Sequence, residues 1–287
     1  MPREKQSQAI GRPYKQLTLP LLQVFREVAR SGSQAAAAVA RLLSIRATTW
    51  PTKDGTASGD TSPRSILKDS SMENSNSATA SGPGVGGISI LLIPTDSRGF
   101  QRTQLRKMGW HASDTHGLTF TDCRVPADHL LGERGRGFAN FLAILDDGRV
   151  AIAALAVGVI QCCLDECLRY AGERSAFGRP IGAYQAVAFK ISDLAVMAAT
   201  ARHLTYHAAW LKDMGRPFKQ EAAMAKLYAT EAAVTATREA TQIFGGYGFM
   251  DETLGSRQYR DSKILEIGEG TSEIQRMIIA RGLGLPQ

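Results

Sequence analysis

The sequence lacks the cysteine spacings that bind metals or build a disulfide framework. Its four cysteines, Cys123, Cys162, Cys163 and Cys167, form no C-x-x-C pair and have no histidine at metal-ligand spacing, so we expect no metal site. The last three fall in a strongly helical pattern, where free thiols pack as small hydrophobic groups. Unpaired thiols are typical of a reducing compartment, which favours a cytoplasmic location.

Long apolar runs and basic stripes with interleaved aromatic residues are also missing. The longest apolar run, Val150–Ile160, is too short to span a bilayer and predicts a buried core helix rather than a membrane span. The formal net charge of +7 falls mostly on residues 1–82, which hold 11 Lys and Arg against 6 Asp and Glu. Because the remainder is close to neutral, nucleic acid is not an expected partner.

Residues 1–84 are predicted to be a leader of low complexity without a fold. Within it, Thr52–Gly84 is dominated by Ser, Thr, Gly, Asn, Asp and Pro, with too few apolar residues to bury. The basic first fifty residues leave three readings open, namely a transit peptide, an unstructured extension, or a start upstream of the true coding frame.

Residues 85–131 are predicted to form part of a β-domain. Ile88–Pro94 is a compact apolar strand, and a turn follows at Thr95–Gly99. Leu118–Val125 alternates between two faces until Pro126 stops it.

Residues 132–287 have a helical period and predict an antiparallel four-helix bundle. We expect helices at Phe138–Glu173, Ala183–Asp213 and Lys219–Phe244, and a fourth after Glu269. Short connections between long amphipathic helices favour antiparallel neighbours. The predicted fold class is therefore mainly α, with a partial antiparallel β-domain before the bundle.

A carboxylate on a turn is the first candidate for chemistry. Glu269 lies between Gly268 and Gly270, so the backbone is free to turn and nothing bulky shields the side chain. Ser272 and Gln275 fit an S-x-x-Q capping box, which predicts a helix start directly after the turn.

Two further clusters contain residues suited to binding. Arg174, in Glu173–Pro180, follows a helix end and offers a planar fork of donors for a diphosphate, or simply neutralises the helix C-terminus. Gly245 and Gly246 form a turn that a cofactor could approach closely, or that merely ends a helix. Arg149 lies in an apolar helix, where it either pairs with a neighbouring aspartate or lies beside the base.

These segments resemble one family. IGEGTSEIQR preceded by YRDSKI, together with ERSAFGRP, QIFGGYGF and GISILLIPTDSRGF, is similar to the later part of the flavin-dependent acyl-CoA dehydrogenases, nearest to short-chain and branched-chain members. The resemblance covers residues 85–287, but the family's earlier β-strands and N-terminal helical domain are not found in the sequence. It implies mitochondrial matrix as the location if the source is eukaryotic.

The resemblance also implies a role for each candidate residue. Glu269 would be the base that removes the α-proton of the thioester, with Arg149 and Gly270 beside the substrate. Gly148 stands where a minority of the family carries its catalytic glutamate, so Glu269 is the only base available. The residues expected to bind FAD are Arg174, Phe177, Ile181, Tyr184, Gln185, Gln242, Gly245, Gly246, Thr271 and Glu273.

The activity implied is FAD-dependent oxidation of a short or branched acyl-CoA to a trans-2-enoyl-CoA, in fatty acid and branched-chain amino acid catabolism. Electron-transfer flavoprotein would accept the electrons, and the assembly would be a homo-oligomer, a tetramer by family analogy. Two alternatives stay open: a truncated, catalytically silent oligomeric relative, and an acyl-CoA oxidase on the same scaffold.

Overall fold

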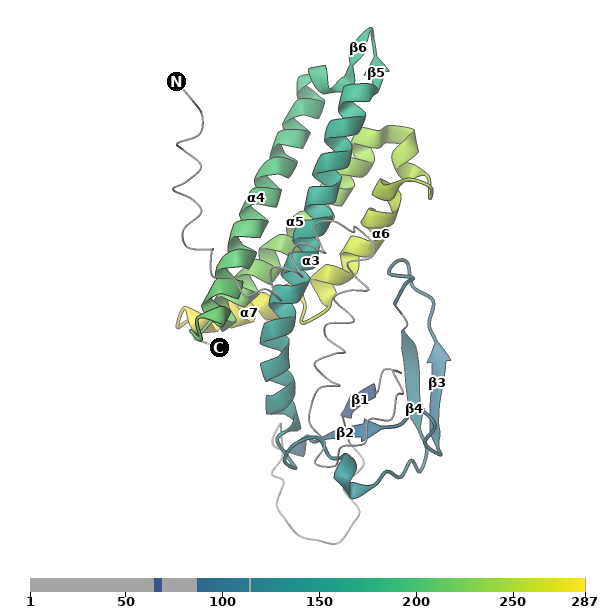
Figure 1. Cartoon of the computed structure of the whole chain (residues 1–287), viewed down its shortest axis with the longest axis vertical. Helices are drawn as coiled ribbons and strands as arrows, with labels where there is room; N and C mark the ends of the chain where they lie inside the picture. The colour runs from purple at the N-terminus through teal and green to yellow at the C-terminus, as the bar shows by residue number, and fades with distance from the viewer. Residues whose placement is uncertain (1–64, 69–86, 114, 287) are drawn as a thin grey trace. The chain divides into compact units, whose positions relative to one another are not determined.

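The computed structural model describes residues 65–68, 87–113 and 115–286 (Figure 1). The expectation of an unfolded leader over residues 1–84 therefore lies outside the described residues, apart from Ser65–Lys68. Those four residues form strand β1, where the composition predicted no element. The reason is pairing with a neighbour, since β1 aligns antiparallel with β2 (Ile90–Ile93) and takes its backbone partners there.

The chain divides into two compact units, and the described residues of the first are 65–68, 87–107 and 115–145. This unit contains the strands of the partial β-domain. Besides the β1–β2 pair, β3 (Phe100–Gln104) pairs antiparallel with β4 (His116–Phe120). The apolar strand expected around Ile88–Pro94 is thus confirmed as β2.

Strand β4 differs from the expected Leu118–Val125, because it begins earlier and ends at Phe120. Two residues later Asp122 has a φ of 47°, a left-handed conformation that turns the chain out of the strand. Strand β3 was missed, since its polar sequence FQRTQ gives no apolar alternation. The two strands are joined on one face by Phe100 and Phe120, whose ring centroids lie 5.1 Å apart.

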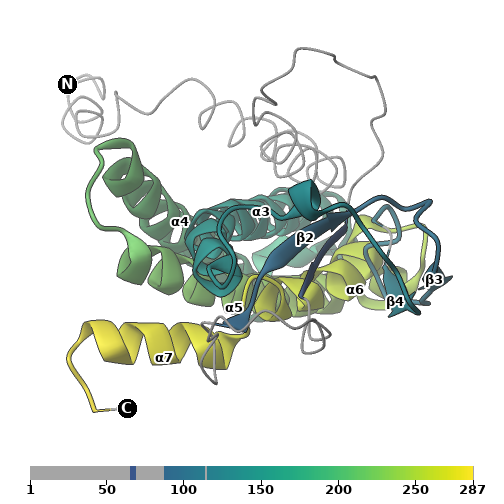
Figure 2. The same cartoon turned by 90° about the horizontal axis from the view of Figure 1, so that it is seen from below.

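The second unit comprises residues 108–113 and 146–286 and contains the helical bundle (Figures 1 and 2). Its helices are α3 (Gly137–Glu173, whose first turns belong to the other unit), α4 (Gln185–Asp213), α5 (Lys219–Phe244), α6 (Leu254–Ile267) and α7 (Ser272–Gly282). A two-residue hairpin of β5 (Ser175–Ala176) and β6 (Arg179–Pro180) connects α3 to α4.

Contacts between the ends of helices confirm the predicted antiparallel arrangement. Lys190, near the start of α4, pairs with Glu239, near the end of α5. Lys212, at the end of α4, pairs with Asp147 of α3 at 2.7 Å. Alanines on one face of α5 let α4 and α6 pack closely against it (Ala222, Ala225, Ala229, Ala233, Ala236 and Ala240).

Helix α6, which the sequence analysis missed, is the fourth long helix of the bundle. It buries mainly polar side chains, including Ser256, Gln258 and Ser262, so its hydrophobic period is weak. Polar contacts replace apolar ones, as in the 3.1 Å hydrogen bond between the hydroxyls of Ser262 and Thr237 of α5. The helix expected after Glu269 is α7, which packs on α5 as an additional element.

Helix α3 is a buried core helix, as its apolar run Val150–Ile160 predicted. Among the described residues it alone is long and apolar enough to cross a membrane, but 67% of its most apolar window is buried inside the protein. Cys163 and Cys167 are buried within it, and all four cysteines are free thiols.

Candidate active site

Glu269 lies on the tight turn between α6 and α7. Its φ is 55° and that of Gly270 is 94°, so a residue with a side chain occupies a conformation that favours glycine. Such a conformation costs on the order of 1 kcal/mol and persists only where the surroundings hold it. Here the side-chain amide of Gln275 holds it, donating to the carbonyls of Glu269 at 3.2 Å and Gly270 at 2.8 Å.

This use of Gln275 shows that the predicted capping box is wrong. Helix α7 begins at Ser272, its N-cap residue is Thr271, and no side chain caps the backbone there. The Ser272 hydroxyl is buried and has no partner among the described residues. The side chain of Gln275 instead donates to the two carbonyls of the turn, and its Oε1, which a capping box would use, has no partner among the described residues.

Lys226 of α5 holds the same turn through hydrogen bonds to its backbone carbonyls. Its side chain is fully buried, and its Nζ donates to the carbonyl of Gly270 at 2.7 Å and to that of Glu266, at the end of α6, at 3.0 Å. Sequence reasoning missed this residue. The signal was present, because Lys226 lies on the face of α5 that otherwise buries alanines, where an unpaired ammonium group would be costly.

The carboxylate of Glu269 occupies the space that the missing side chain of Gly148 leaves on α3. A Cβ at position 148 would lie 2.3 Å from Oε2 and 2.7 Å from Cδ of Glu269. Arg149, the next residue, is 2% exposed and pairs with Asp146, while its Nε has no partner among the described residues. The ion pair with an aspartate and the position near Glu269, proposed as alternatives from the sequence, therefore occur together.

The electrostatic surroundings shift the pKa of the Glu269 carboxyl. Burial raises the pKa of Glu269, and the positive charges of Arg149 and Lys226 oppose that rise. Burial also lowers the pKa of Lys226 to about 8, against the opposing effect of Glu266. A carboxylate with a raised pKa is a stronger base, so the turn presents a half-buried carboxylate suited to proton abstraction.

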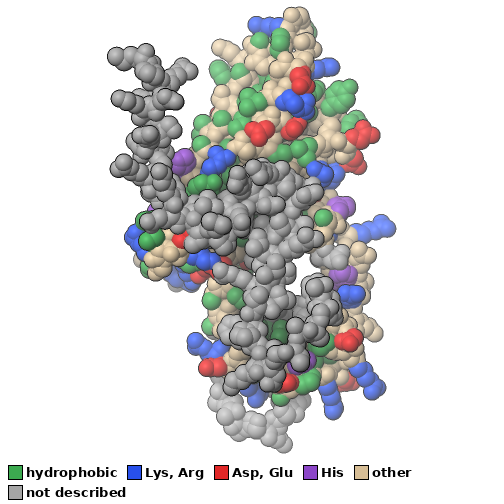
Figure 3. Space-filling view, viewed as in Figure 1, with side chains coloured by type: hydrophobic (Ala, Val, Ile, Leu, Met, Phe, Trp, Pro, Cys, Tyr) green, Lys and Arg blue, Asp and Glu red, His purple; other side chains and the backbone are tan. Residues whose placement is uncertain are grey.

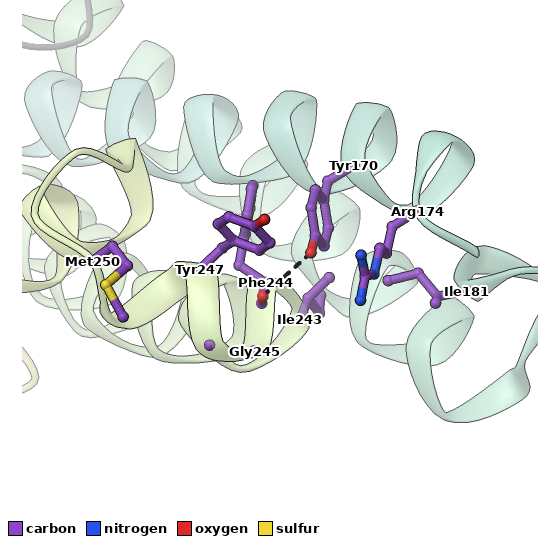
Figure 4. A pocket seen from close by; sticks show the side chains of 9 residues that line it. Tyr170, Arg174, Ile181, Ile243, Phe244, Gly245, Tyr247 and Met250 are labelled. Carbon is purple, nitrogen blue, oxygen red and sulfur yellow. Dashed lines mark hydrogen bonds between the residues drawn. The ribbon is translucent and has the colours of Figure 1, made fainter. Parts of the chain in front are cut away.

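A pocket of about 540 Å³ lies at the other end of the bundle (Figure 4). Four of the predicted cofactor residues meet there, namely Arg174 and Ile181 from the α3–α4 connection and Gly245 and Gly246 after α5. The remaining lining residues were not predicted (Tyr170, Ile243, Phe244, Tyr247 and Met250). The rings of Tyr170 and Phe244 stack at 4.4 Å and form one wall.

Other predicted residues lie beside this pocket without lining it. Phe177 is 97% exposed at the tip of the hairpin, with a φ of 50°. Tyr184 contacts both strands of the hairpin. Its hydroxyl donates to the carbonyl of Ala176 at 2.8 Å, and the Cζ of Arg179 lies 4.1 Å from the centroid of its ring. Gln185 and Gln242 are exposed outside the lining of the pocket, at the start of α4 and the end of α5 respectively.

The expected cofactor residues thus form two separate groups. Thr271 and Glu273 lie with Glu269 at one end of the bundle. Hydrogen bonds from the Thr271 hydroxyl and from the backbone N–H of Glu273 lower the pKa of the Glu273 carboxyl. Arg149 lies in α3 near the Glu269 turn, and Arg174 directly follows the last residue of α3; at 1.5 Å per residue they are about 38 Å apart along the helix axis.

Comparison with known proteins identifies the family. The family profile described as "Acyl-CoA dehydrogenase, C-terminal domain" matches residues 135–284, which include the bundle and make up more than half of the chain. The chain belongs to the acyl-CoA dehydrogenase family. The probable acyl-CoA dehydrogenase YngJ of Bacillus subtilis is 52% identical over 197 residues, which cover 68% of this chain and 52% of YngJ.

Solved structures of acyl-CoA dehydrogenases and of other proteins are also similar to this chain. The butyryl-CoA dehydrogenase of Megasphaera elsdenii is 40% identical with a TM-score of 0.68, covering 70% of this chain and 53% of that one. A structure of PigA with FAD and proline is 32% identical with a TM-score of 0.68, covering 70% of this chain and 53% of PigA. The chain therefore spans about half the length of the relatives it matches.

Proposed function

We propose that this protein acts in the FAD-dependent α,β-dehydrogenation of a short or branched acyl-CoA, with Glu269 as the base. The observation that carries the proposal is the half-buried Glu269 carboxylate, with its raised pKa, held on a strained turn against Gly148. Membership of the acyl-CoA dehydrogenase family supports the reaction class, and the similarity to a butyryl-CoA dehydrogenase supports a short acyl chain.

The chain's own groups account for the proton-transfer half of the reaction. Glu269 takes the α-proton, and its raised pKa brings the basicity nearer to that required. No described residue accepts a hydrogen bond from the backbone N–H of Glu269, so this donor is free to bond the thioester oxygen as negative charge develops there. Arg149 and Gly270 would lie beside the bound substrate, as the resemblance implies.

The residues present fit FAD, which when bound supplies the acceptor for the hydride from the β-carbon. Arg174 offers an unpaired fork of donors to a diphosphate, since no described residue pairs with its guanidinium, and Gly245 and Gly246 leave room for close approach. Phe177, Tyr184, Gln185 and Gln242 would contact the exposed edge of the same cofactor.

The separation of the two groups supports an oligomer. The pocket at Arg174 and the turn at Glu269 are too far apart to serve one compact ligand, so we infer that each end contacts a different FAD, shared with another subunit. Exposed hydrophobic side chains at the hairpin end of the bundle, including Phe177 and Phe189, favour burial against another subunit (Figure 3). We propose a homotetramer whose reduced flavin would pass its electrons to electron-transfer flavoprotein.

Replacement of Glu269 tests the function. Glu269→Gln should retain FAD and lose at least about 10³-fold in acyl-CoA turnover, since general-base losses typically lie between about 10²- and 10⁴-fold. Glu266→Gln is the matched control, because the Glu266 carboxylate pairs with Lys263 of the same helix. Near-normal turnover of Glu269→Gln would refute the assignment of the base.

The preparation itself separates the alternatives. A colourless protein that binds no FAD would identify a catalytically silent relative. Peroxide released in air during turnover would identify an acyl-CoA oxidase, whereas transfer of electrons to electron-transfer flavoprotein supports the dehydrogenase.

A further inference from the structure

We propose that Lys226 is a positioning residue for the base: its buried ammonium group holds together the two sides of the turn that carries Glu269. The inference deepens the proposed function and rests on Glu269 being the base. Lys226 lies on α5, so it acts on the reacting group from a different element, through the backbone.

The hydrogen bonds of Lys226 join the two ends of the turn. One acceptor is the carbonyl of Glu266, in the last turn of α6, and the other is the carbonyl of Gly270, directly after the base. Gln275 reaches the same Gly270 carbonyl from α7 at 2.8 Å. The strained residue Glu269 is thus fixed from α5 and from α7, and both fixing side chains are fully buried.

An apolar side chain would be the simpler choice for this position. The neighbours of Lys226 on the buried face of α5 are alanines and threonines, and none of them carries charge. Burying an ammonium group costs free energy that an apolar residue would avoid, and the lowering of the Lys226 pKa to about 8 reflects that cost. A turn that must hold a strained carboxylate in place gives a reason for keeping the lysine.

The charges around Lys226 link it to the basicity of Glu269 as well. Glu266 of α6, Glu269 on the turn and Glu231 of α5 favour its charged form, while Arg149 of α3 disfavours it. In return, the charge of Lys226 opposes the rise in the pKa of Glu269. Lys226 therefore influences both where the base lies and how strongly it holds a proton.

Amide hydrogen exchange and the titration of Glu269 test the proposal in the full chain. Lys226→Met removes the donors and the charge. We expect exchange of the Gly268 amide, which donates to the carbonyl of Ile264 at 2.8 Å, to accelerate at least about tenfold while the middle of α3 keeps its protection. The pKa of Glu269, followed by carbon NMR and assigned with Glu269→Gln, should rise. Lys226→Arg should restore part of both, and Lys219→Met, at an exposed lysine at the start of α5, should change neither.

A folded Lys226→Met protein with unchanged exchange of the Gly268 amide and an unchanged Glu269 pKa would overturn the proposal. If that variant does not fold, Lys226→Gln keeps an amide donor without the charge, and it must still raise the Glu269 pKa. Failure of both to fold would also overturn it, because Lys226 would then hold the bundle rather than the turn. Near-normal turnover of Glu269→Gln would instead refute the proposed function and leave the exchange result intact.

Discussion

Replacement of Gly148 by alanine should separate stability from function at this site. Alanine in a helix interior is about 0.5–1 kcal/mol more favourable than glycine. Its Cβ, however, would lie 2.3 Å from Oε2 of Glu269, and ordinary contacts begin near 3.5 Å, so the carboxylate must move by roughly 1 Å. The atoms met are the end of a flexible side chain, so the carboxylate should move and α3 should stay in place.

A double-mutant cycle in denaturant unfolding measures this displacement. In the Glu269→Ala background the obstruction is absent, so Gly148→Ala should give the full helix gain. With Glu269 present the gain should be smaller by about 0.5 kcal/mol or more, the size of coupling usual for residues in contact. Gly172→Ala on the same helix is the control, because a Cβ there meets nothing within 4 Å and its effect should not depend on Glu269.

Turnover provides the second measurement on Gly148→Ala. A misplacement of about 1 Å in a reacting group can cost about 10²-fold in rate, so we expect a loss of that order with no loss of melting temperature. The reasoning is refuted if Gly148→Ala gives the same stability gain in both backgrounds and normal turnover.

Three further predictions concern charge and cofactor. Burial lowers the pKa of Lys226 from 10.5 to about 8, so between these pH values the folded state holds fewer protons than the unfolded state. The free energy of unfolding of the wild type relative to that of Lys226→Met should therefore rise by about 3 kcal/mol as the pH increases from about 8 to 10.5, as urea unfolding would measure. Burial raises the pKa of Glu269, so its ionised form costs stability at neutral pH; Glu269→Gln should melt higher than the wild type at pH 7, and this advantage should disappear below pH 4.5. Arg174→Ala should weaken FAD binding by about 1.5–3 kcal/mol and lower the melting temperature of the oligomer only when FAD is present; an unchanged FAD affinity in sedimentation and titration would make Arg174 structural.

The sequence predicted the long helices well because their pattern is strong and local. The end of α5 at Phe244 and the start of α3 within one residue of Phe138 follow from glycines that interrupt a sustained apolar period. Helix α6 could not be found in this way, since Ser256, Gln258 and Ser262 are buried through polar contacts that depend on the neighbouring helices. Periodicity detects burial of apolar groups, and it does not detect a polar interface.

The part of the candidate site that lies in one short segment, the turn at Glu269, was predicted from the sequence. Glu269 and its two flanking glycines are adjacent in sequence, and the turn they predict is present. The role of Gln275 was misread, because the S-x-x-Q pattern describes a local hydrogen bond and the actual acceptors are the carbonyls of the strained turn. Lys226 was missed since its partners, the carbonyls of Glu266 on α6 and of Gly270 on the turn, lie far from it in sequence.

The relation between Gly148 and Glu269 shows why the sequence position of a carboxylate does not by itself locate the proposed base. The family resemblance implies that a glutamate at position 148 can serve as the base in some members. In this chain the carboxylate of Glu269 fills the space in which a Cβ of residue 148 would lie. A carboxylate from position 148 and one from position 269 would thus occupy nearly the same space, and this space has room for only one of them. A small residue at position 148 is therefore a requirement of using Glu269, and a glutamate there would have to displace it.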